Sequence, residues 1–263
     1  MERLLTRLIA FDLDGTLLDL DKTIPARSLS VVRELRAHGC KIAVITGRAV
    51  VPDDVQEGLA PDATATNNGG VVQVGETTVA EHLLGPEQVR AVLNALPSEA
   101  RVFAIGEDAL FVKDPENENP ENKEWNGMAV RPLAELGERS LRQLGVRFDG
   151  AHAFRERLLA LGGLTVTGGL EPYSYFLTVT TGAANKGSAL REIAAALHIP
   201  IKDTIVFGDS DNDVDMFKVA GVAVQVGEAE CLIDHAHHRV SCSALGLPGW
   251  LENYAGELAR ELA

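Results

Sequence analysis

Cysteine and basic residues are both scarce in this 263-residue sequence. Its three cysteines, Cys40, Cys231 and Cys242, are odd in number and match no zinc-ligand spacing. This excludes a disulfide framework and predicts free thiols in a reducing compartment. Lysine and arginine number 24 against 38 acidic residues, which gives a net charge of −14. Such a surface repels nucleic acid and anionic membranes, because both are bound through positive side chains.

Long hydrophobic runs are also missing. No stretch approaches the ~20 apolar residues of a membrane helix, and residues 1–7 are too polar for a signal peptide. We therefore expect a cytoplasmic protein that binds neither a membrane nor nucleic acid. With 46% hydrophobic and 24% charged residues, the chain is globular in composition and long enough for one large domain or two smaller ones. The sequence does not distinguish a monomer from a dimer.

Strand and helix patterns alternate in the first and last parts of the chain. Short, fully apolar runs that stop at polar turns are typical of buried parallel strands. Such runs lie at 8–11, 41–45, 63–66, 204–207 and 221–226. Helical spacing of apolar residues lies between Thr23 and Gly39, at 186–197 and at 250–262, with an edge strand expected at 239–242. This alternation predicts an α/β fold with a Rossmann-like parallel sheet.

The middle of the chain has a different texture. Helical patterns lie at 86–96 and 132–144, and an acidic, Asn-rich loop lies at 114–127. A segment that alternates apolar and polar residues lies at 173–179. We therefore expect an inserted α+β domain at residues 80–181. The parallel-sheet core would then consist of residues 1–79 and 182–263.

Four polar clusters lie far apart in the sequence but at comparable places in this pattern. Three of them directly follow predicted strands, and the fourth, Lys186, opens a helix that precedes a strand. The three are Asp12 with Asp14, Thr46-Gly47-Arg48, and residues 209–213. The carboxyl ends of parallel strands share one edge of the sheet, where ligands bind. The fold pattern therefore predicts that all four clusters meet.

Four carboxylates in such a cluster need a compensating charge. Asp12, Asp14, Asp209 and Asp213 would lie within a few ångströms of one another, and two carboxylates about 4 Å apart repel by roughly 4 kcal/mol at an effective dielectric constant of about 20. A hard divalent cation with oxygen ligands offsets this repulsion, and Mg²⁺ also coordinates substrate phosphate. Paired His or Cys residues are absent nearby, which argues against zinc.

The remaining residues suit phosphate chemistry. The Thr46 hydroxyl and the Gly47 backbone N–H can donate to phosphoryl oxygens, and Lys186 supplies a positive charge. Phosphoryl transfer depends on positioning and charge stabilisation. Because no Ser-His or Cys-His pair is evident, a carboxylate is the plausible nucleophile. Arg48 is expected to bind substrate or to orient its loop.

The same segments carry a family resemblance. The motifs FDLDGTL, ITGR, NKG and GDSDND, at 11–17, 45–48, 185–187 and 208–213, resemble the four ordered motifs of haloacid dehalogenase-like (HAD) phosphatases. The insertion between the second and third motifs resembles the large α/β cap of the Cof-type subgroup, which closes over the core and selects the substrate. Two departures from the family pattern lie near the end of the chain: Gly227-Glu228-Ala229 and Gly246-Leu247-Pro248-Gly249.

The resemblance implies a role for each motif residue. Asp12 would be the nucleophile and a Mg²⁺ ligand, and Asp14 the general acid–base, which touches the metal through its backbone carbonyl. Asp209 and Asp213 would complete the metal site. The phosphate would be bound by Thr46, Gly47, Lys186 and Asn212.

The expected activity is therefore hydrolysis of a small phosphorylated metabolite, such as a sugar phosphate, through an aspartyl-phosphate intermediate. A phosphomutase of the phosphomannomutase type shares these motifs, because acceptor choice depends on how the cap excludes water. A non-enzymatic phospho-ligand sensor is disfavoured because every catalytic position is intact. A receiver-type signalling domain does not suit the long insertion or Asp14, and a dehalogenase has no use for the acidic cluster.

Overall fold

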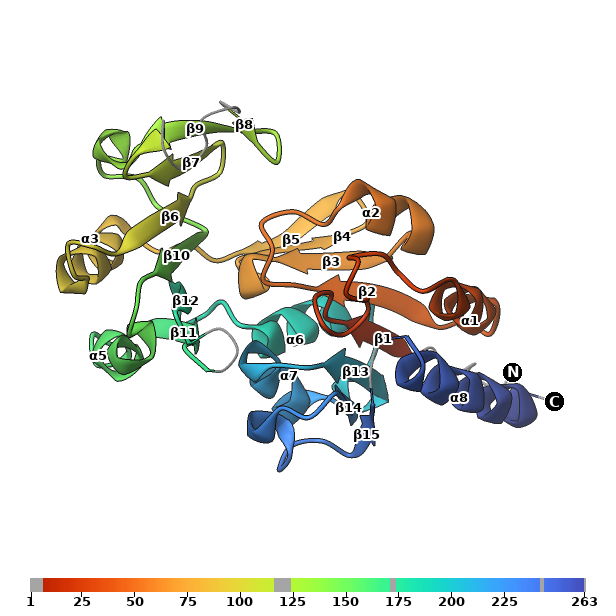
Figure 1. Ribbon diagram of the computed structural model, residues 1–263. Coiled ribbons are helices and arrows are strands. Elements are labelled where there is room, and N and C mark those ends of the chain that lie inside the picture. The colour runs from red at the N-terminus through yellow and green to blue at the C-terminus, as the bar shows by residue number, and fades with distance from the viewer. Residues whose placement is uncertain (1–6, 116–123, 171–173, 242–243, 263) are drawn as a thin grey trace. The chain divides into compact units, whose positions relative to one another are not determined.

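The computed structural model describes residues 7–115, 124–170, 174–241 and 244–262, and it divides into two compact units (Figure 1). The first unit runs up to Ala80 and resumes at Lys186, and the second spans Glu81–Asn185. Within the described part of the chain, no helix combines the length and the apolar character that crossing a bilayer requires.

The first unit is built on an eight-stranded sheet with the order β15-β14-β13-β1-β2-β3-β4-β5. Its strands are β1 (Leu8–Phe11), β2 (Lys41–Ile45), β3 (Ala63–Thr66), β4 (Val71–Val74), β5 (Thr77–Glu81), β13 (Thr204–Gly208), β14 (Val222–Val226) and β15 (His238–Val240). Neighbours from β15 through β3 are parallel, and β4 is antiparallel to β3. The predicted Rossmann-like α/β core is confirmed. The β4–β5 hairpin was not predicted.

Helices cover both faces of this sheet because side chains alternate along each buried strand. Ile9 and Phe11 point to the face with α1 (Ala26–Ala37), α2 (Asp53–Leu59) and α8 (Gly246–Leu262). Leu8 and Ala10 point to the face with α6 (Lys186–Ala196) and α7 (Val214–Val219). Phe11 also stacks on Phe207 of the neighbouring strand, with ring centroids 5.0 Å apart. Each fully buried Leu, Ile or Phe side chain of this kind stabilises the fold by roughly 1.5–3 kcal/mol.

The second unit is a seven-stranded, mostly antiparallel sheet with the order β11-β12-β10-β6-β7-β9-β8. Its strands are β6 (Arg101–Ile105), β7 (Ala109–Val112), β8 (Glu124–Trp125), β9 (Met128–Pro132), β10 (Gln143–Arg147), β11 (Leu164–Gly168) and β12 (Phe176–Thr181). Helices α3 (Pro86–Ala95) and α5 (Arg155–Leu159) pack on one face, against Val102, Leu144 and Leu177. The insertion thus has the predicted α+β character.

Short 3₁₀ turns connect several of these elements. They are η1 (Asn67–Gly69), η2 (Leu133–Glu135), η3 (Ala151–Phe154), η4 (Ile201–Asp203), η5 (Asp211–Asp213) and η6 (Glu230–Leu232). Both η1 and η5 directly follow core strands or their turns, at the edge of the sheet where the polar motifs lie.

The predicted helix at 132–144 is wrong. The chain forms only the η2 turn there, Gly137 takes a left-handed φ of 60°, and β10 begins at Gln143. Leu141 forms an antiparallel bridge with Leu84, and Leu144 pairs with Val179. The leucines were spaced as on a helix face, but strand pairing buries them instead. Of the predicted loop at 114–127, residues 116–123 lie outside the described part of the chain.

Two glycines of the first unit offer a matched test of packing. A Cβ on Gly221, just before β14, would overlap the backbone carbonyl of Lys202, whereas a Cβ on Gly256 of α8 meets nothing within 4 Å. We expect Gly221→Ala to lower the free energy of unfolding by about 2 kcal/mol or more, because backbone must move. Gly256→Ala should raise it by up to about 1 kcal/mol through helix propensity. Urea unfolding measures both, and equal effects would contradict the described packing.

Candidate active site

The carboxyl ends of three central strands carry the polar motifs to one edge of the sheet. Strand β1 lies between β13 and β2, and Phe11 is in register with both Phe207 and Val44. The segments that follow these strands therefore leave the sheet next to one another. Asp12 follows β1, and its backbone N–H donates to the Phe207 carbonyl at 3.0 Å. The edge predicted from the sequence thus exists.

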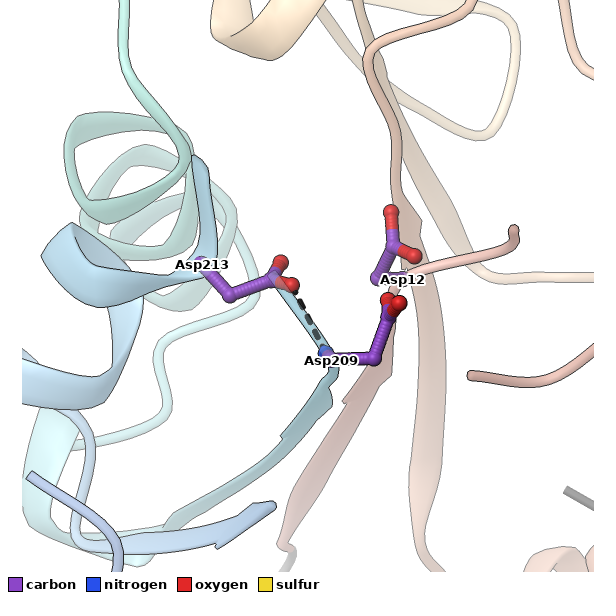
Figure 2. Close-up of side chains that lie close together, drawn as sticks. All are labelled: Asp12, Asp209 and Asp213. Carbon is purple, nitrogen blue, oxygen red and sulfur yellow. Dashed lines mark hydrogen bonds between the residues drawn. The ribbon is translucent and has the colours of Figure 1, made fainter. Parts of the chain in front are cut away.

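Three carboxylates converge at this edge. Asp12, Asp209 and Asp213 each offer an oxygen atom, and these atoms lie within 4.8 Å of one another (Figure 2). Asp12 and Asp213 are buried. Burial raises the pKa of Asp12 to about 6, despite the opposing effect of Lys186. Burial, together with Asp12 and Asp213, raises the pKa of Asp209 to about 8. The ionised forms of Asp12 and Asp209 are therefore disfavoured in this cluster. Its all-oxygen donor set fits a hard divalent cation, whose charge would offset the repulsion.

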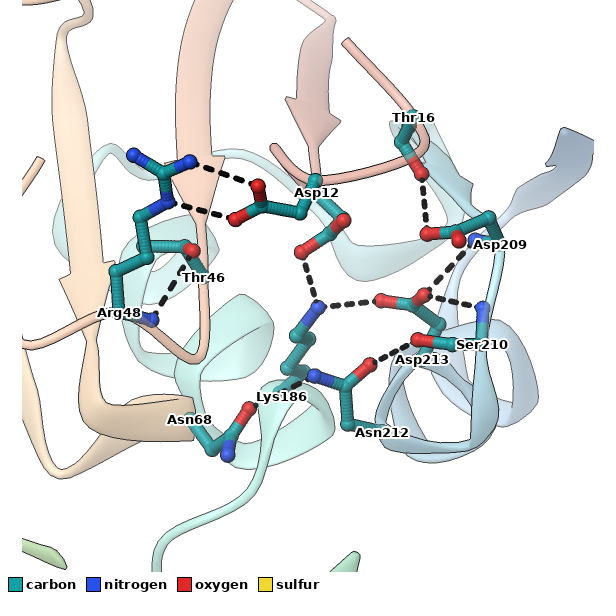
Figure 3. A network of polar contacts seen from close by, with 11 residues as sticks. Asp12, Thr16, Thr46, Arg48, Asn68, Lys186, Asp209, Ser210, Asn212 and Asp213 are labelled. Atoms are coloured by element: carbon teal, nitrogen blue, oxygen red, sulfur yellow. Dashed lines mark hydrogen bonds and ion pairs between the residues drawn. The ribbon is translucent and has the colours of Figure 1, made fainter. Parts of the chain in front are cut away.

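Lys186 is the positive centre of the cluster. It is fully buried at the start of α6, and its Nζ lies 2.5 Å from Asp12 Oδ1 and 2.6 Å from Asp213 Oδ1 (Figure 3). Burial by itself lowers the pKa of this amine, but the two carboxylates outweigh burial and raise the pKa. A buried cation needs such partners, because leaving one charge unpaired is strongly destabilising. Lys186 is therefore protonated and fixed between its two acids.

Asp213 also organises the loop after β13. Its Oδ2 accepts hydrogen bonds from the backbone N–H groups of Asp209, at 2.9 Å, and Ser210, at 3.0 Å. A Cβ at Gly208 would overlap the Asp213 carboxyl group, so the chain needs glycine there. Asp213 thus binds Lys186 with one oxygen and shapes the Asp209 turn with the other.

The first motif positions a residue of the fourth. Thr16 Oγ1 donates to Asp209 Oδ1 at 3.0 Å. Gly15 has a left-handed φ of 85°, and a Cβ there would overlap the Asp209 carboxylate. Sequence reasoning assigned Thr16 and Gly15 no role, although both lie inside the first motif. The contact between them and Asp209 depends on β1 and β13 being neighbours.

The predicted phosphate-binding residues form a second group beside the carboxylates. Asn212 Nδ2 donates to Asn68 Oδ1 at 3.1 Å, and Ser210 Oγ donates to Asn212 Oδ1 at 2.8 Å (Figure 3). A Cβ on Gly47 would lie 3.1 Å from Asn68 Oδ1 and 3.5 Å from Asn212 Nδ2. Thr46 is buried next to Gly47, and its Oγ1 accepts from the Arg48 backbone N–H at 3.2 Å. The structure therefore brings Thr46, Gly47 and Asn212 together.

Asn68 was missed by the sequence analysis. It lies in η1, where Asn67, Asn68 and Gly69 have φ values of 52°, 54° and 93°. Such left-handed non-glycine residues are strained and persist only where other contacts hold them. Here the Asn68 N–H donates to the Thr46 carbonyl at 3.0 Å and the Asn67 N–H to the Arg48 carbonyl at 2.8 Å. Its sequence signal was the Asn-Asn-Gly-Gly run directly after a predicted strand.

Arg48 contacts a carboxylate. Its Nε lies 2.6 Å from Asp14 Oδ2 and its Nη2 2.7 Å from Asp14 Oδ1, a bidentate pair. Lys22 Nζ adds a third contact, 2.9 Å from Asp14 Oδ1. Burial would raise the pKa of Asp14, but hydrogen bonds and charge from Arg48 and Lys22 outweigh it and lower the pKa to about 2. In this arrangement Asp14 is ionised and cannot donate a proton.

Comparisons with known proteins agree with this geometry. Residues 9–244 match the family model of haloacid dehalogenase-like hydrolases. The chain is 30% identical to a phosphoglycolate phosphatase of Halobacterium salinarum, over 87% of this chain and 86% of that protein. It is 28% identical to the HMP-PP phosphatase of Cronobacter sakazakii, over 86% and 85%.

A solved structure of a HAD subclass IIB sugar phosphatase superimposes with a TM-score of 0.82 at 22% identity, covering 95% of this chain and 99% of that one. This likeness concerns the fold. Together with the family match over residues 9–244, it confirms the resemblance that the four motifs predicted. The chain belongs to the haloacid dehalogenase-like hydrolase family.

Proposed function

We propose that this chain is a Mg²⁺-dependent phosphatase that hydrolyses a small phosphomonoester through an aspartyl phosphate on Asp12. The observation that carries the proposal is the buried Lys186 ion-paired with Asp12 and Asp213, with Asp209 alongside. Asp12 is a carboxylate held next to a fixed cation, in an acidic cluster that could bind a metal ion. This arrangement suits attack on a phosphoryl group. Two relatives, at 30% and 28% identity, are named phosphatases.

The metal would be held by carboxylate oxygens of Asp12, Asp209 and Asp213. The family resemblance adds the backbone carbonyl of Asp14 as a further ligand. When bound, a divalent cation neutralises the acidic cluster and stabilises negative charge on the phosphoryl oxygens. Asp213 already accepts hydrogen bonds on both of its oxygens. Its main contribution is therefore to hold Lys186 and the Asp209 turn in place.

Asp12 attacks phosphorus with a carboxylate oxygen while the bond from phosphorus to the leaving alkoxide breaks. Lys186 donates to Asp12 Oδ1 at 2.5 Å, which fixes the rotamer and leaves the other oxygen to react. The Thr46 hydroxyl, the Gly47 N–H and the Asn212 amide bind the phosphoryl oxygens. Because Asn68 and Ser210 position the Asn212 amide in advance, this amide needs little reorganisation during the reaction.

Asp14 would protonate the leaving alkoxide and then accept a proton from the water that attacks the aspartyl phosphate, breaking the Asp12–phosphorus bond. It can do so only after Arg48 releases it, because the Arg48 pair lowers the pKa of Asp14 to about 2. We propose that the incoming anionic substrate draws the Arg48 guanidinium away. Arg48 would then serve both as substrate ligand and as positioning residue for Asp14. Substrate selection by the inserted unit and a cytoplasmic location stay predictions.

The first test removes the nucleophile. Asp12→Asn should lower Mg²⁺-dependent hydrolysis of p-nitrophenyl phosphate by about a thousandfold or more, because the amide cannot form the intermediate. EDTA should silence the unmodified protein, and added Mg²⁺ should restore it. Asp215→Asn is the matched control, because Asp215 is a half-exposed carboxylate of α7 that forms an ion pair with Lys218. Substantial turnover by the Asp12 variant would remove the proposed role of Asp12.

The second test concerns Arg48. Arg48→Gln should raise the pKa of Asp14 from about 2 toward the ordinary value of about 4, because Lys22 alone remains as a cationic partner. NMR titration of side-chain carboxyl carbons measures this value. We also expect kcat/KM to fall about tenfold or more. Lys22→Gln should have a smaller effect on both, since Lys22 makes a single exposed contact. An unmoved Asp14 pKa would contradict the role given to Arg48.

The third test concerns pH. The pKa of Asp209 is about 8 in the folded protein and about 4 when unfolded, so the folded state binds more protons between these values. Stability of the metal-free protein should therefore fall as pH rises from about 4 to about 8. Asp209→Asn should flatten this slope above pH 6, where Asp12 has largely titrated. Thermal melts in EDTA measure it, and Mg²⁺ should restore stability at pH 8. If the stability of the unmodified protein did not change with pH in this range, the raised pKa of Asp209 would be contradicted.

A further inference from the structure

Three strands of the inserted unit meet at one end of its sheet. Strand β6 begins at Arg101, β10 ends at Arg147 and β12 begins at Phe176. In the antiparallel register, Arg147 lies directly opposite both Arg101 and Phe176, so all three share one face of the sheet. Helices α3 and α5 pack on the opposite face, against Val102 and Leu177. The two arginines therefore project from the face that these helices leave uncovered.

A pocket of about 530 Å³ lies at this end of the sheet, a volume typical of small-molecule sites. It is lined by Glu99, Arg101, Arg147, Phe148, Asp149 and Tyr175. The guanidinium carbon of Arg147 lies 5.0 Å from the centre of the Tyr175 ring. The Phe148 N–H donates to the Tyr175 carbonyl at 3.0 Å, and the Phe148 ring is buried against Phe154. The aromatic wall of the pocket is thus anchored to the core of the unit.

The two guanidinium groups of the pocket differ in their ion pairing from three other arginines of the unit. Elsewhere in the unit, Arg90, Arg139 and Arg142 each form an ion pair with a carboxylate. Among residues 7–115, 124–170, 174–241 and 244–262, none forms an ion pair with Arg101 or Arg147. Like charges placed directly opposite each other on two strands are destabilising. The repulsion would be relieved by an anion that bridges them.

We propose that this pocket binds an oxyanion, a carboxylate or a phosphate, carried by a small molecule that also bears hydroxyl or amino groups. Each guanidinium presents a planar fork of donors that matches an oxyanion, and the Tyr175 ring fixes the plane of one fork. Glu99 and Asp149 accept hydrogen bonds from donor groups beside the anion and disfavour a bare polyanion. The oxyanion is either a second charged group of the substrate or a separate ligand.

Binding can be tested without turnover. Glycerate is a suitable probe, because it carries one carboxylate and two hydroxyl groups and no phosphate. In EDTA, the full-length protein labelled with ¹⁵N should show saturable shifts of the Arg147 and Gly145 backbone amides. The Gly47 amide, which reports on the candidate active site, should not move with them. Arg101→Gln and Arg147→Gln should each weaken binding by about tenfold or more, since each removes a charge-assisted contact.

Arg139→Gln is the matched control, because Arg139 is an exposed arginine of the same unit that is paired with Asp108. It should leave glycerate affinity unchanged. Melting temperatures of the Arg101 and Arg147 variants should not fall, since each variant removes a like-charge contact. Arg147→Lys keeps the positive charge but removes the planar set of guanidinium donors. This variant should also bind glycerate more weakly. Unsaturable shifts, or affinity that is the same in all four variants, would overturn the proposal.

Enzyme kinetics distinguish a charged group of the substrate from a separate ligand as the source of the anion. This experiment rests on the proposed function. Phosphoglycerate carries a carboxylate on its leaving group, and glycerol 3-phosphate carries none. A rise in KM of about tenfold for phosphoglycerate alone in Arg147→Gln would assign the pocket to the substrate. Unchanged KM values with glycerate binding lost would assign it to a separate ligand. Absence of any phosphatase activity would sink the proposed function and leave the glycerate result standing.

Discussion

The buried ion pairs of Lys186 are the interaction on which the core depends. A fully buried amine that contacts Asp12 at 2.5 Å and Asp213 at 2.6 Å cannot lose either acid without leaving an unpaired charge in the interior. These three residues come from the ends of β1 and η5 and from the start of α6. The pairing therefore ties the first and last thirds of the chain together at one edge of the sheet. The same contacts orient Asp12 and, through Asp213, the backbone of Asp209.

Steric limits reinforce this electrostatic constraint. Gly15 and Gly208 lie where a Cβ would overlap the carboxyl groups of Asp209 and Asp213. Both acids are thus packed against backbone, and Asp213 also contacts Lys186. Such a site has few alternative rotamers, which is what preorganised stabilisation of a phosphoryl group requires. The same close packing brings the carboxylates of Asp12, Asp209 and Asp213 near one another, which makes them repel.

The two units use arginine in different ways. In the core, Arg48 forms a bidentate pair with Asp14 and keeps that acid ionised. In the inserted unit, Arg101 and Arg147 face each other and have no ion-paired acid among the described residues. We propose that an incoming anion binds to both kinds of arginine.

By itself, the sequence determined the parallel core, the four motifs and their convergence, because short apolar runs ending in polar turns report strand ends directly. It also placed β1, β2 and β3 at their observed bounds. Tertiary structure decided what Arg48 contacts, the roles of Thr16 and Asn68, and the fate of residues 132–144. Partner choice for a long side chain depends on which strands are neighbours, and Thr16 meets Asp209 only because β1 adjoins β13. The leucines of 132–144 fit a helix locally, but pairing of Leu141 and Leu144 with distant strands buries them.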